Sequence, residues 1–349
     1  MRILELKAVD GFIVFDLDCP TSAGGTRMAP DVTVQETALL ARAMTYKLAI
    51  VGRRMGGAKA GIRAGQEDRK AVLARYVEEI RPLVEREEFL TASDMGTQPQ
   101  DFASLGARPT RMHDEDDTGT TLDAVLTGLG VIAAADAAVG GLAGASLAIE
   151  GFGKVGGAAA IEAVRLGGRV VALSTVHGAV VDPAGLDIDQ LLDLRRRHGD
   201  RCAQHAGRPV LPAAALYEVD ADVLVPGART GALDAPRASA VQARVVAPAA
   251  NVPYTTGGLG ALEARGVVAL ADFVCNAGAT IGYLTERAGN LQTTEQIRDV
   301  VATRVSQTIT ETMAHPDGPF AGACHAAEQF LRRWRDPDGM PAGPPPAVD

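Results

Sequence analysis

A glycine turn at 151–156, with the sequence GFGKVG, constrains the fold of this 349-residue chain more than any other feature. It directly follows the apolar run Leu147-Ala-Ile-Glu and opens a segment with the pattern of a helix. In such a unit the first glycine permits the tight turn, the second lets a pyrophosphate approach the backbone, and the third lets helix and strand pack closely. The phosphates would lie at the positive end of the helix dipole. The sequence therefore predicts a dinucleotide site here.

Strands and helices alternate through the second part of the chain. We expect helices at about 120–139 and 155–166, and strands at 146–150, 169–174, 223–225, 245–247 and 273–275. Such alternation is typical of parallel strand-helix-strand units and predicts a doubly wound sheet. The apolar stretch 129–149 is interrupted by Asp136 and three glycines, so we interpret it as a buried helix followed by a strand, not a membrane span.

The first part of the chain has a different pattern. We expect strands at 3–7 and 11–17, helices at 34–47 and 67–85, a glycine-rich turn at 55–61, and a short strand from Phe89 that ends at an aspartate. Polar residues 98–117 form a loop or hinge, which places a domain boundary near 118. We therefore predict an α/β fold with domains at 1–118 and 119–289. The helices expected within 290–335 are candidates to pack back on the first domain, and 336–349 is expected to be a disordered tail.

The overall charge and the cysteines exclude several classes of protein. The formal net charge of −9 argues against a general nucleic-acid binder, which would show a basic stripe. The N-terminus has no long apolar core, so it does not resemble a signal peptide. The four cysteines contain no CxxC pair, and the histidines form no cluster. We expect reduced thiols, a cytoplasmic location, no membrane partner and no metal site.

Lysine is rare in this chain, so the lysines that remain attract interest. Only 5 of the 34 basic residues are lysines, and Lys47 and Lys59 lie twelve positions apart, with Lys59 inside GGAKAG. Lysines usually lie at the surface, and these two have that ordinary interpretation as well. Unlike arginine, however, a buried lysine can exchange a proton near neutral pH. We therefore treat Lys59, and less strongly Lys47, as functional candidates.

Several motifs together resemble the Glu/Leu/Phe/Val dehydrogenase family. In family order they are GGTRM (24–28), MTYK (44–47), GGAKAG (56–61), TASDMGT (91–97), DTG (117–119), the glycine turn, PAAN (248–251) and NAG (276–278). The resemblance covers about residues 20–285, and its length and spacing are closer to the leucine, valine and phenylalanine branch. It implies an N-terminal α/β domain for substrate and oligomerisation, a Rossmann-type domain for the dinucleotide, and a cleft between them.

The resemblance also implies a reaction and roles for named residues. The family interconverts an L-amino acid and a 2-oxo acid with ammonia, using NAD or NADP. Lys47 would bind the substrate carboxylate, Lys59 would polarise the 2-oxo group, and Asp94 would carry protons to and from the amine. This division suits the physical chemistry, because a carboxylate between two ammonium groups keeps its charge.

Further positions match family contacts to the cofactor or the substrate. The cofactor positions are Thr118, Gly151, Gly153, Lys154, Val155, Gly156, Thr175, Ala228, Asn251 and Asn276. The substrate positions, besides Lys47, are Ala23, Gly24, Met44, Asn276, Thr280 and Tyr283. Taken singly, Thr118 could be a helix cap and the two asparagines could be turn residues. Thr175 stands where an NAD enzyme usually has a carboxylate, so the choice between NAD and NADP stays open, with a lean to NAD.

The substrate side chain is predicted to be non-acidic. Family members specific for glutamate carry a lysine immediately before the GG of the GGTR-like segment, where this chain has Ala23. Thr280 and Tyr283 stand where relatives specific for aliphatic substrates carry valine. The resemblance thus implies an aliphatic or aromatic L-amino acid as substrate and at least a homodimer. Two alternatives remain: a catalytically silent paralogue that binds dinucleotide, and an imine or oxo-acid reductase on the same scaffold.

Overall fold

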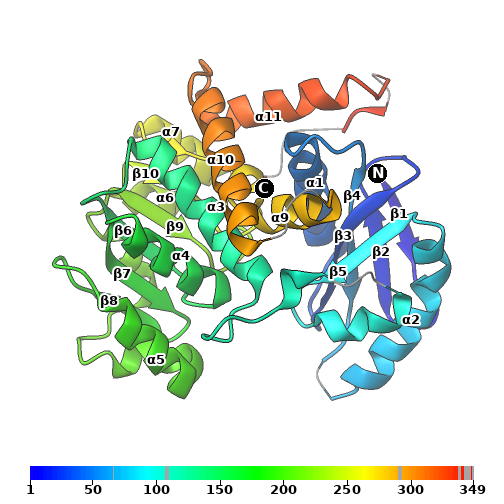
Figure 1. Ribbon diagram of the computed structural model, residues 1–349, viewed down its shortest axis with the longest axis horizontal. Coiled ribbons are helices and arrows are strands. Elements are labelled where there is room, and N and C mark those ends of the chain that lie inside the picture. Colours follow the sequence, from blue (N-terminus) through cyan, green and yellow to red (C-terminus); the bar gives the residue numbers. More distant parts are fainter. Residues whose placement is uncertain (66, 107–109, 290–292, 337–338, 342–346, 348–349) are drawn as a thin grey trace. The chain divides into compact units, whose positions relative to one another are not determined.

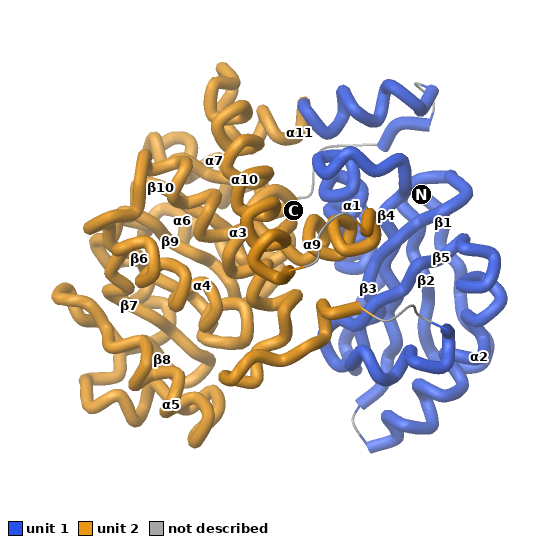
Figure 2. Tube along the Cα trace, in the orientation of Figure 1, with its two compact units in different colours: residues 1–109, 326–346 blue, residues 110–325, 347–349 orange. Residues whose placement is uncertain are grey.

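The chain folds into two compact units, coloured separately in Figure 2. The computed structural model describes residues 1–65, 67–106, 110–289, 293–336, 339–341 and 347. Unit 1 comprises Met1–Pro109 and Ala326–Pro346, and unit 2 comprises Thr110–His325 and Ala347–Asp349. The first change of unit therefore lies at 109, nine residues before the boundary expected at 118. The two-domain α/β fold class is confirmed.

Unit 1 is built on a mixed sheet in the order β1-β2-β4-β3-β5. Its strands are β1 (Arg2–Glu5), β2 (Gly11–Phe15), β3 (Ser22–Met28), β4 (Gly56–Ile62) and β5 (Phe89–Ser93). The pairs β1/β2 and β2/β4 are antiparallel, whereas β3 is parallel to both β4 and β5. The parallel part of the sheet brings segments near residues 25, 59 and 92 into one row, although they are far apart in the sequence.

The segment 56–61 forms most of the central strand β4, so the prediction of a glycine-rich turn at 55–61 is wrong. The glycines serve close packing instead. A Cβ at Gly57 would lie 2.0 Å from the carbonyl oxygen of Ala41 on helix α1 (Val34–Ile50), and a Cβ at Gly61 would lie 2.7 Å from the ring of Phe12. Glycine is therefore required here because a neighbouring helix and strand come too close for any side chain.

Helices cover both faces of the unit 1 sheet (Figure 1). Alternate β4 residues such as Ala58 and Ala60 join the apolar core under helix α2 (Arg69–Glu85), with Tyr76 and Ile80 fully buried. On the opposite face, Phe12 and Val14 of β2 pack with Ala41 of α1. Since side chains alternate along a strand, Lys59 belongs to the α1 face of the sheet.

Unit 2 contains a sheet in the order β11-β10-β9-β6-β7-β8. Its strands are β6 (Ser146–Glu150), β7 (Arg169–Thr175), β8 (Gly178–Val181), β9 (Val223–Pro226), β10 (Val245–Val246) and β11 (Val268–Ala269). All pair in parallel except β8, which returns antiparallel along β7. The order reverses at β6, which carries the glycine turn at its end, so this is the switch point at which doubly wound sheets bind ligands.

Unit 2 has the helices expected at about 120–139 and 155–166 and the first of those expected within 290–335, together with others that the sequence pattern did not predict. They are α3 (Leu122–Val139), α4 (Lys154–Arg165), α5 (Ile188–His198), α6 (Ala235–Ala240), α7 (Thr256–Ala264), α8 (Asp272–Cys275), α9 (Gly278–Arg287) and α10 (Thr294–Met313). The strand expected at 273–275 is wrong, because these residues form α8. Helix α3 is apolar and long enough to span a membrane, but 61% of it is buried in the protein, as in a core helix.

Short helices and the chain ends complete the structure. The polar segment after β5 contains the 3-10 helices η1 (Pro99–Leu105) and η2 (Arg111–His113), and two more, η3 (Gly199–His205) and η4 (Ala213–Glu218), precede β9. The last helix, α11 (Gly318–Leu331), begins in unit 2 and ends in unit 1, where Tyr46 donates a hydrogen bond to Glu328. The tail expected at 336–349 lies largely outside the described residues.

Candidate active site

Lys59 and Asp94 form an ion pair on the α1 face of the unit 1 sheet. Lys59 Nζ lies 3.0 Å from Asp94 Oδ2, and the side chains are only 10% and 20% exposed. Lys59 projects from the middle of β4, while Asp94 directly follows β5. The two motifs that the sequence singled out separately, GGAKAG and TASDMGT, therefore meet because β3 pairs with both strands.

Arg27, on β3, is a third member of this site. Its Nε donates to the same Asp94 oxygen, Oδ2, at 3.0 Å. Burial alone would raise the pKa of Asp94, but the charges of Lys59 and Arg27 and their hydrogen bonds outweigh it and lower this pKa to about 2. Asp94 is therefore a carboxylate at every physiological pH. Sequence reasoning placed Arg27 only inside the GGTRM motif and predicted no strand there, so nothing in the pattern brought Arg27 close to Asp94.

Helix α1 holds Lys47 against this sheet. The Lys47 residue is 8% exposed, which is rare for lysine. Two residues earlier, the Thr45 hydroxyl accepts a hydrogen bond from the N–H of Gly57 at 2.9 Å and donates one to the buried Asp16 at 2.6 Å. Arg42 pairs with the same carboxylate at 2.7 Å. This buried network fixes the end of α1, and hence Lys47, to the strand that carries Lys59.

Small residues leave room around the Lys59–Asp94 pair. A Cβ at Gly25 would lie 3.2 Å from Lys59 Nζ and 3.0 Å from Asp94 Cβ. Ala23 is two residues earlier on β3 and shares this face of the sheet, where it is partly exposed. Gly24 lies on the other face, and a Cβ there would be 1.6 Å from the carbonyl oxygen of Ala58, so its role is strand packing. Met44 on α1 is also partly exposed.

The glycine turn of unit 2 has the shape that a dinucleotide requires. Gly151 has a φ of +84°, which favours glycine, and a Cβ at Gly156 would lie 1.9 Å from the carbonyl oxygen of Gly151. A Cβ at Gly153 would meet nothing within 4 Å, so the space in front of the turn is open. Lys154 and Val155 form the first turn of α4, Lys154 exposed and Val155 partly buried. These residues fit a pyrophosphate at the helix N-terminus.

The end of β7 carries no carboxylate, as the sequence showed, but a cation reaches the turn from another helix. Thr175 is buried, and its hydroxyl accepts a hydrogen bond from the N–H of His177 at 3.2 Å. Arg195 of α5 donates to the carbonyl oxygen of Gly153 at 2.8 Å. Burial lowers the pKa of the half-buried Arg195, and within the described part of the chain no carboxylate lies within ion-pair distance of it. The sequence pattern missed Arg195 because it lies 42 positions after Gly153.

Residues at the ends of β6 and β9 are tied together beside the turn. The carboxylate of Glu150, which directly precedes Gly151, accepts a hydrogen bond from the Tyr217 hydroxyl at 2.5 Å and one from the N–H of Ala228 at 3.3 Å. Burial and the Glu150 charge raise the pKa of Tyr217, so the phenol remains a donor. The backbone at Ala228 is thereby fixed where the family pattern places a cofactor contact.

Asn251 and Asn276 contact each other. The Nδ2 of Asn276 donates to the Oδ1 of Asn251 at 3.0 Å and to the carbonyl oxygens of Ala249 and Ala250, each at 3.2 Å. The next residue, Val252, has a φ of +50°, a strained conformation for a β-branched residue, and its N–H donates to the buried Asp272 at 2.9 Å. Strain of this kind is concentrated at functional sites, which supports a role for Asn251 beyond that of a turn residue.

The remaining predicted positions also lie in unit 2. The N–H and hydroxyl of Thr118 both donate to Asp116 Oδ1, at 2.8 and 2.6 Å, so this side chain shapes the loop before α3. Thr118 is not the N-cap of α3, which was the alternative interpretation of this residue, since Thr121 is the N-cap. Thr280 and Tyr283 lie on α9, and Tyr283 is 42% exposed with Arg287 4.9 Å from its ring centre.

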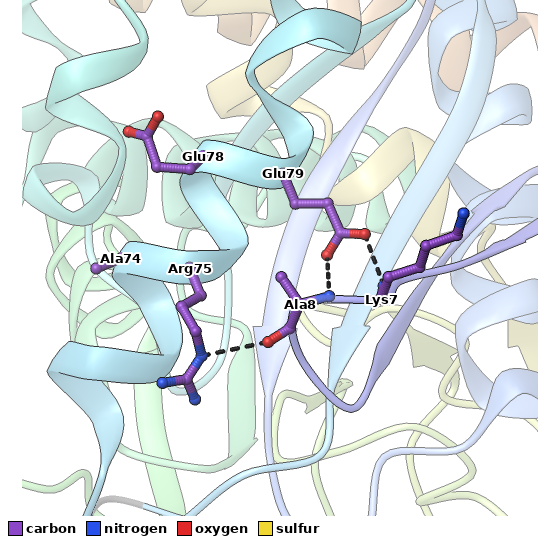
Figure 3. A pocket seen from close by; sticks show the side chains of 6 residues that line it. All are labelled: Lys7, Ala8, Ala74, Arg75, Glu78 and Glu79. Carbon is purple, nitrogen blue, oxygen red and sulfur yellow. Dashed lines mark hydrogen bonds between the residues drawn. The ribbon is translucent and has the colours of Figure 1, made fainter.

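A surface groove on the α2 face of unit 1 has a structural purpose (Figure 3). It is lined by Lys7, Ala8, Ala74, Arg75, Glu78 and Glu79. The two oxygens of Glu79 accept the N–H groups of Lys7 and Ala8 at 2.6 and 2.8 Å, and Arg75 donates to the carbonyl oxygen of Ala8 at 3.2 Å. These groups hold the β1–β2 connection on α2, and the groove shares no residue with the site around Lys59.

Family models match both units. The model described as Glu/Leu/Phe/Val dehydrogenase, dimerisation domain, matches residues 5–108, and the model described as Glutamate/Leucine/Phenylalanine/Valine dehydrogenase matches residues 119–316. The match to the first model contains Lys47, Lys59 and Asp94, and the match to the second contains the glycine turn.

Known proteins with similar sequences include several glutamate dehydrogenases. A glutamate dehydrogenase of Aeropyrum pernix is 29% identical over 302 residues, which cover 78% of this chain and 71% of the relative. An NADP-specific glutamate dehydrogenase of Saccharolobus shibatae is 28% identical over 292 residues, covering 76% of this chain and 68% of the relative. These names do not support the expected closeness to the leucine, valine and phenylalanine branch, nor the lean to NAD.

Solved structures share the fold over nearly the whole chain. The hetero-hexameric glutamate dehydrogenase from Thermus thermophilus superposes with a TM-score of 0.78 at 25% identity, covering 96% of this chain and 89% of the other. An L-tryptophan dehydrogenase from Nostoc punctiforme superposes with a TM-score of 0.65 at 22% identity, covering 95% of each chain. The latter likeness shows the fold alone.

Proposed function

The chain belongs to the Glu/Leu/Phe/Val dehydrogenase family and is an amino acid dehydrogenase, and on this premise we propose that it catalyses the reversible oxidative deamination of a non-acidic L-amino acid. The amino acid, NAD(P)⁺ and water give the 2-oxo acid, NAD(P)H, ammonium and a proton. The observation that carries the proposal is the buried pair of Lys59 and Asp94, which joins a proton-exchanging cation to a carboxylate.

The two side chains divide the proton transfers between them. Lys59 Nζ has three donor positions, of which one is directed to Asp94, so another can donate to the 2-oxo group and make its carbon more electrophilic. Asp94 accepts a proton from the substrate amino group and returns it in the reverse direction. A nicotinamide dinucleotide bound at the glycine turn 151–156 would supply the hydride-transfer chemistry at the substrate Cα. Lys47, a buried cation, would hold the α-carboxylate.

Ala23 supports a non-acidic substrate side chain. It lies on the same sheet face as Lys59, two residues before Gly25, and it brings no charge to that face. A substrate carboxylate buried there without a cation would carry a desolvation penalty of several kcal/mol, roughly as for other unpaired buried charges. Relatives of this chain are named glutamate dehydrogenases, so 2-oxoglutarate is the reference substrate in the test of this proposal.

The cofactor belongs to the same proposal. The sequence leans to NAD, whereas two of the relatives are named for NADP. Arg195 brings a guanidinium to the glycine turn, and Thr175 brings no negative charge to the end of β7. Both features favour a cofactor that carries an additional phosphate. We therefore place NADP before NAD as the cofactor to test.

We also propose a cytoplasmic homo-oligomer, at least a dimer. The first family model is described as a dimerisation domain, and one structural neighbour is a hetero-hexamer by name. None of the four cysteines forms a disulfide and three of them are buried, which agrees with a reducing compartment. The mass in solution, measured by light scattering, tests the oligomer.

A panel of 2-oxo acids tests the function. Each acid is mixed with ammonium and either NADH or NADPH, and the loss of nicotinamide absorbance is followed. Turnover of aliphatic or aromatic acids above 2-oxoglutarate supports the proposal, and preferred turnover of 2-oxoglutarate refutes the substrate class. Dinucleotide binding without any turnover would favour the silent paralogue. Turnover that does not need ammonium would favour the imine or oxo-acid reductase.

A further inference from the structure

Arg27 connects the catalytic pair to a second carboxylate. Its side chain is 10% exposed, with Nε 3.0 Å from Asp94 Oδ2 and Nη1 2.5 Å from Glu36 Oε1 on the first turn of α1. Arg27, Glu36, Lys59 and Asp94 thus form a charged cluster of two cations and two anions with no net charge. Such mutual compensation allows charged groups to be buried together.

The two cations approach the same oxygen of Asp94. Lys59 Nζ and Arg27 Nε each lie 3.0 Å from Oδ2. Among the residues that the structure describes, none donates a hydrogen bond to the other oxygen, Oδ1. The carboxylate therefore has one oxygen that is fixed by two donors and one that is available to a substrate. The charge of Arg27 is also permanent, because a guanidinium does not release its proton in a protein, whereas a lysine can.

We propose that Arg27 is a positioning residue for the deamination: it fixes Oδ2 of Asp94, so that Oδ1 exchanges the proton with the substrate amino group, and Glu36 in turn orients Arg27. This role rests on the proposed function. While Lys59 donates to the substrate with another of its hydrogens, Arg27 holds the carboxylate in place by its own hydrogen bond. The site therefore keeps its geometry through the proton transfers without depending on the lysine.

The positioning role of Arg27 predicts a change in the pH profile that a purely structural role would not produce. Arg27 contributes to the low pKa of Asp94 by its charge and its hydrogen bond. Removal of this cation raises the pKa of Asp94, so protonation of the carboxylate begins at a higher pH. The acidic limb of the kcat/KM profile then moves to higher pH, since the enzyme requires the ionised carboxylate.

The test compares R27Q, R27K and E36Q with wild type. R27Q is expected to lower kcat roughly 10- to 100-fold, with a smaller change in KM for the 2-oxo acid. A positioned proton-transfer group usually contributes roughly 100- to 10,000-fold, and the loss is expected to lie at or below the lower end of that range because Arg27 acts through Asp94. R27K retains a cation and should restore part of kcat. E36Q removes the ion pair that orients Arg27 but keeps Arg27 itself. Because the Glu36 side chain is 33% exposed, E36Q is expected to fold, and it replaces R27Q in the test if R27Q does not fold.

R63Q is the matched control, since Arg63 follows β4 and pairs with Asp10 on the exposed surface at 2.8 Å. It should keep the wild-type kcat and pH profile. A ¹³C NMR titration of the Asp94 carboxyl gives a readout independent of turnover, and its pKa should be higher in R27Q. Turnover by wild type with unchanged kcat and Asp94 pKa in R27Q would overturn the role of Arg27. Absence of turnover by wild type would overturn the proposed function, and the role with it.

Discussion

The charged cluster of unit 1 and the glycine turn of unit 2, the two candidate binding sites, are built in opposite ways. The charged cluster depends on four ionised side chains that compensate one another, drawn from β3, β4, α1 and the end of β5. The glycine turn depends on the absence of side chains, since a Cβ at Gly156 would overlap the backbone at Gly151. The charged cluster should therefore be sensitive to the loss of one charged side chain, whereas the glycine turn should be sensitive to the addition of a side chain.

The loss of Lys59 should have the largest effect. Lys59→Ala removes the group that we propose polarises the 2-oxo group, and it should lower kcat at least ~1000-fold, within the range for acid–base groups. Dinucleotide affinity, measured by fluorescence titration, should stay at the wild-type value because the glycine turn lies in unit 2. Lys70→Ala, an exposed lysine on α2, is the control and should turn over normally. An active K59A enzyme would remove Lys59 from the mechanism.

The addition of one methyl group should be the most damaging change in the glycine turn. Gly156→Ala places a Cβ 1.9 Å from the Gly151 carbonyl oxygen, and overpacking of this kind costs about 3 kcal/mol. Thermal denaturation and dinucleotide titration should both show the loss. Gly260→Ala in α7 is the control, because a Cβ there meets nothing within 4 Å and alanine favours a helix interior. Equal behaviour of the two variants would contradict the packing role of Gly156.

These two sites also differ in how well the sequence predicts them. The glycine turn is local: strand, turn and helix lie within twenty residues, so the pattern alone located β6 and α4 correctly. The charged cluster is assembled from residues 27, 36, 59 and 94, and the resemblance to a family was needed to select Lys59 and Asp94. Nothing in the order of residues indicates that β3 lies between β4 and β5, so Arg27 remained unnoticed.

The errors in secondary structure have the same origin. Glycines at 57 and 61 indicate a turn by their local preference, but in β4 they permit close contact with α1 and with Phe12. The run Phe273-Val-Cys275 has strand-forming residues, yet it is a turn of helix, α8, whose side chains are buried. In both cases tertiary packing outweighs local propensity, and packing partners cannot be deduced from one short segment.

A positive charge added at residue 23 of unit 1 tests whether the charge at this position determines which substrate side chain is accepted. Ala23→Lys places a cation on the sheet face of Lys59 and should lower kcat/KM for apolar 2-oxo acids about tenfold, with a relative gain for 2-oxoglutarate, because a buried carboxylate then has a partner. The same substitution at Ala74, exposed on α2, controls for the added charge. Unchanged kinetics of A23K across the panel would show that residue 23 does not contact the substrate side chain.

Substitution of Arg195 should have the smallest effect. It is also the sharpest test of the contrast between the charged cluster and the glycine turn, because Arg195 places a charge beside a site that otherwise depends on shape. Arg195→Gln keeps a donor near the Gly153 carbonyl oxygen but removes the charge. If the guanidinium binds an additional phosphate, the Kd for NADPH should rise about fivefold, or about 1 kcal/mol for a half-exposed pair, with the Kd for NADH unchanged. Arg196→Gln, on the exposed side of α5 and paired with Asp193, should change neither. An equal loss of affinity for both cofactors would instead mean that Arg195 acts through the Gly153 backbone, and the glycine turn would then depend on shape alone.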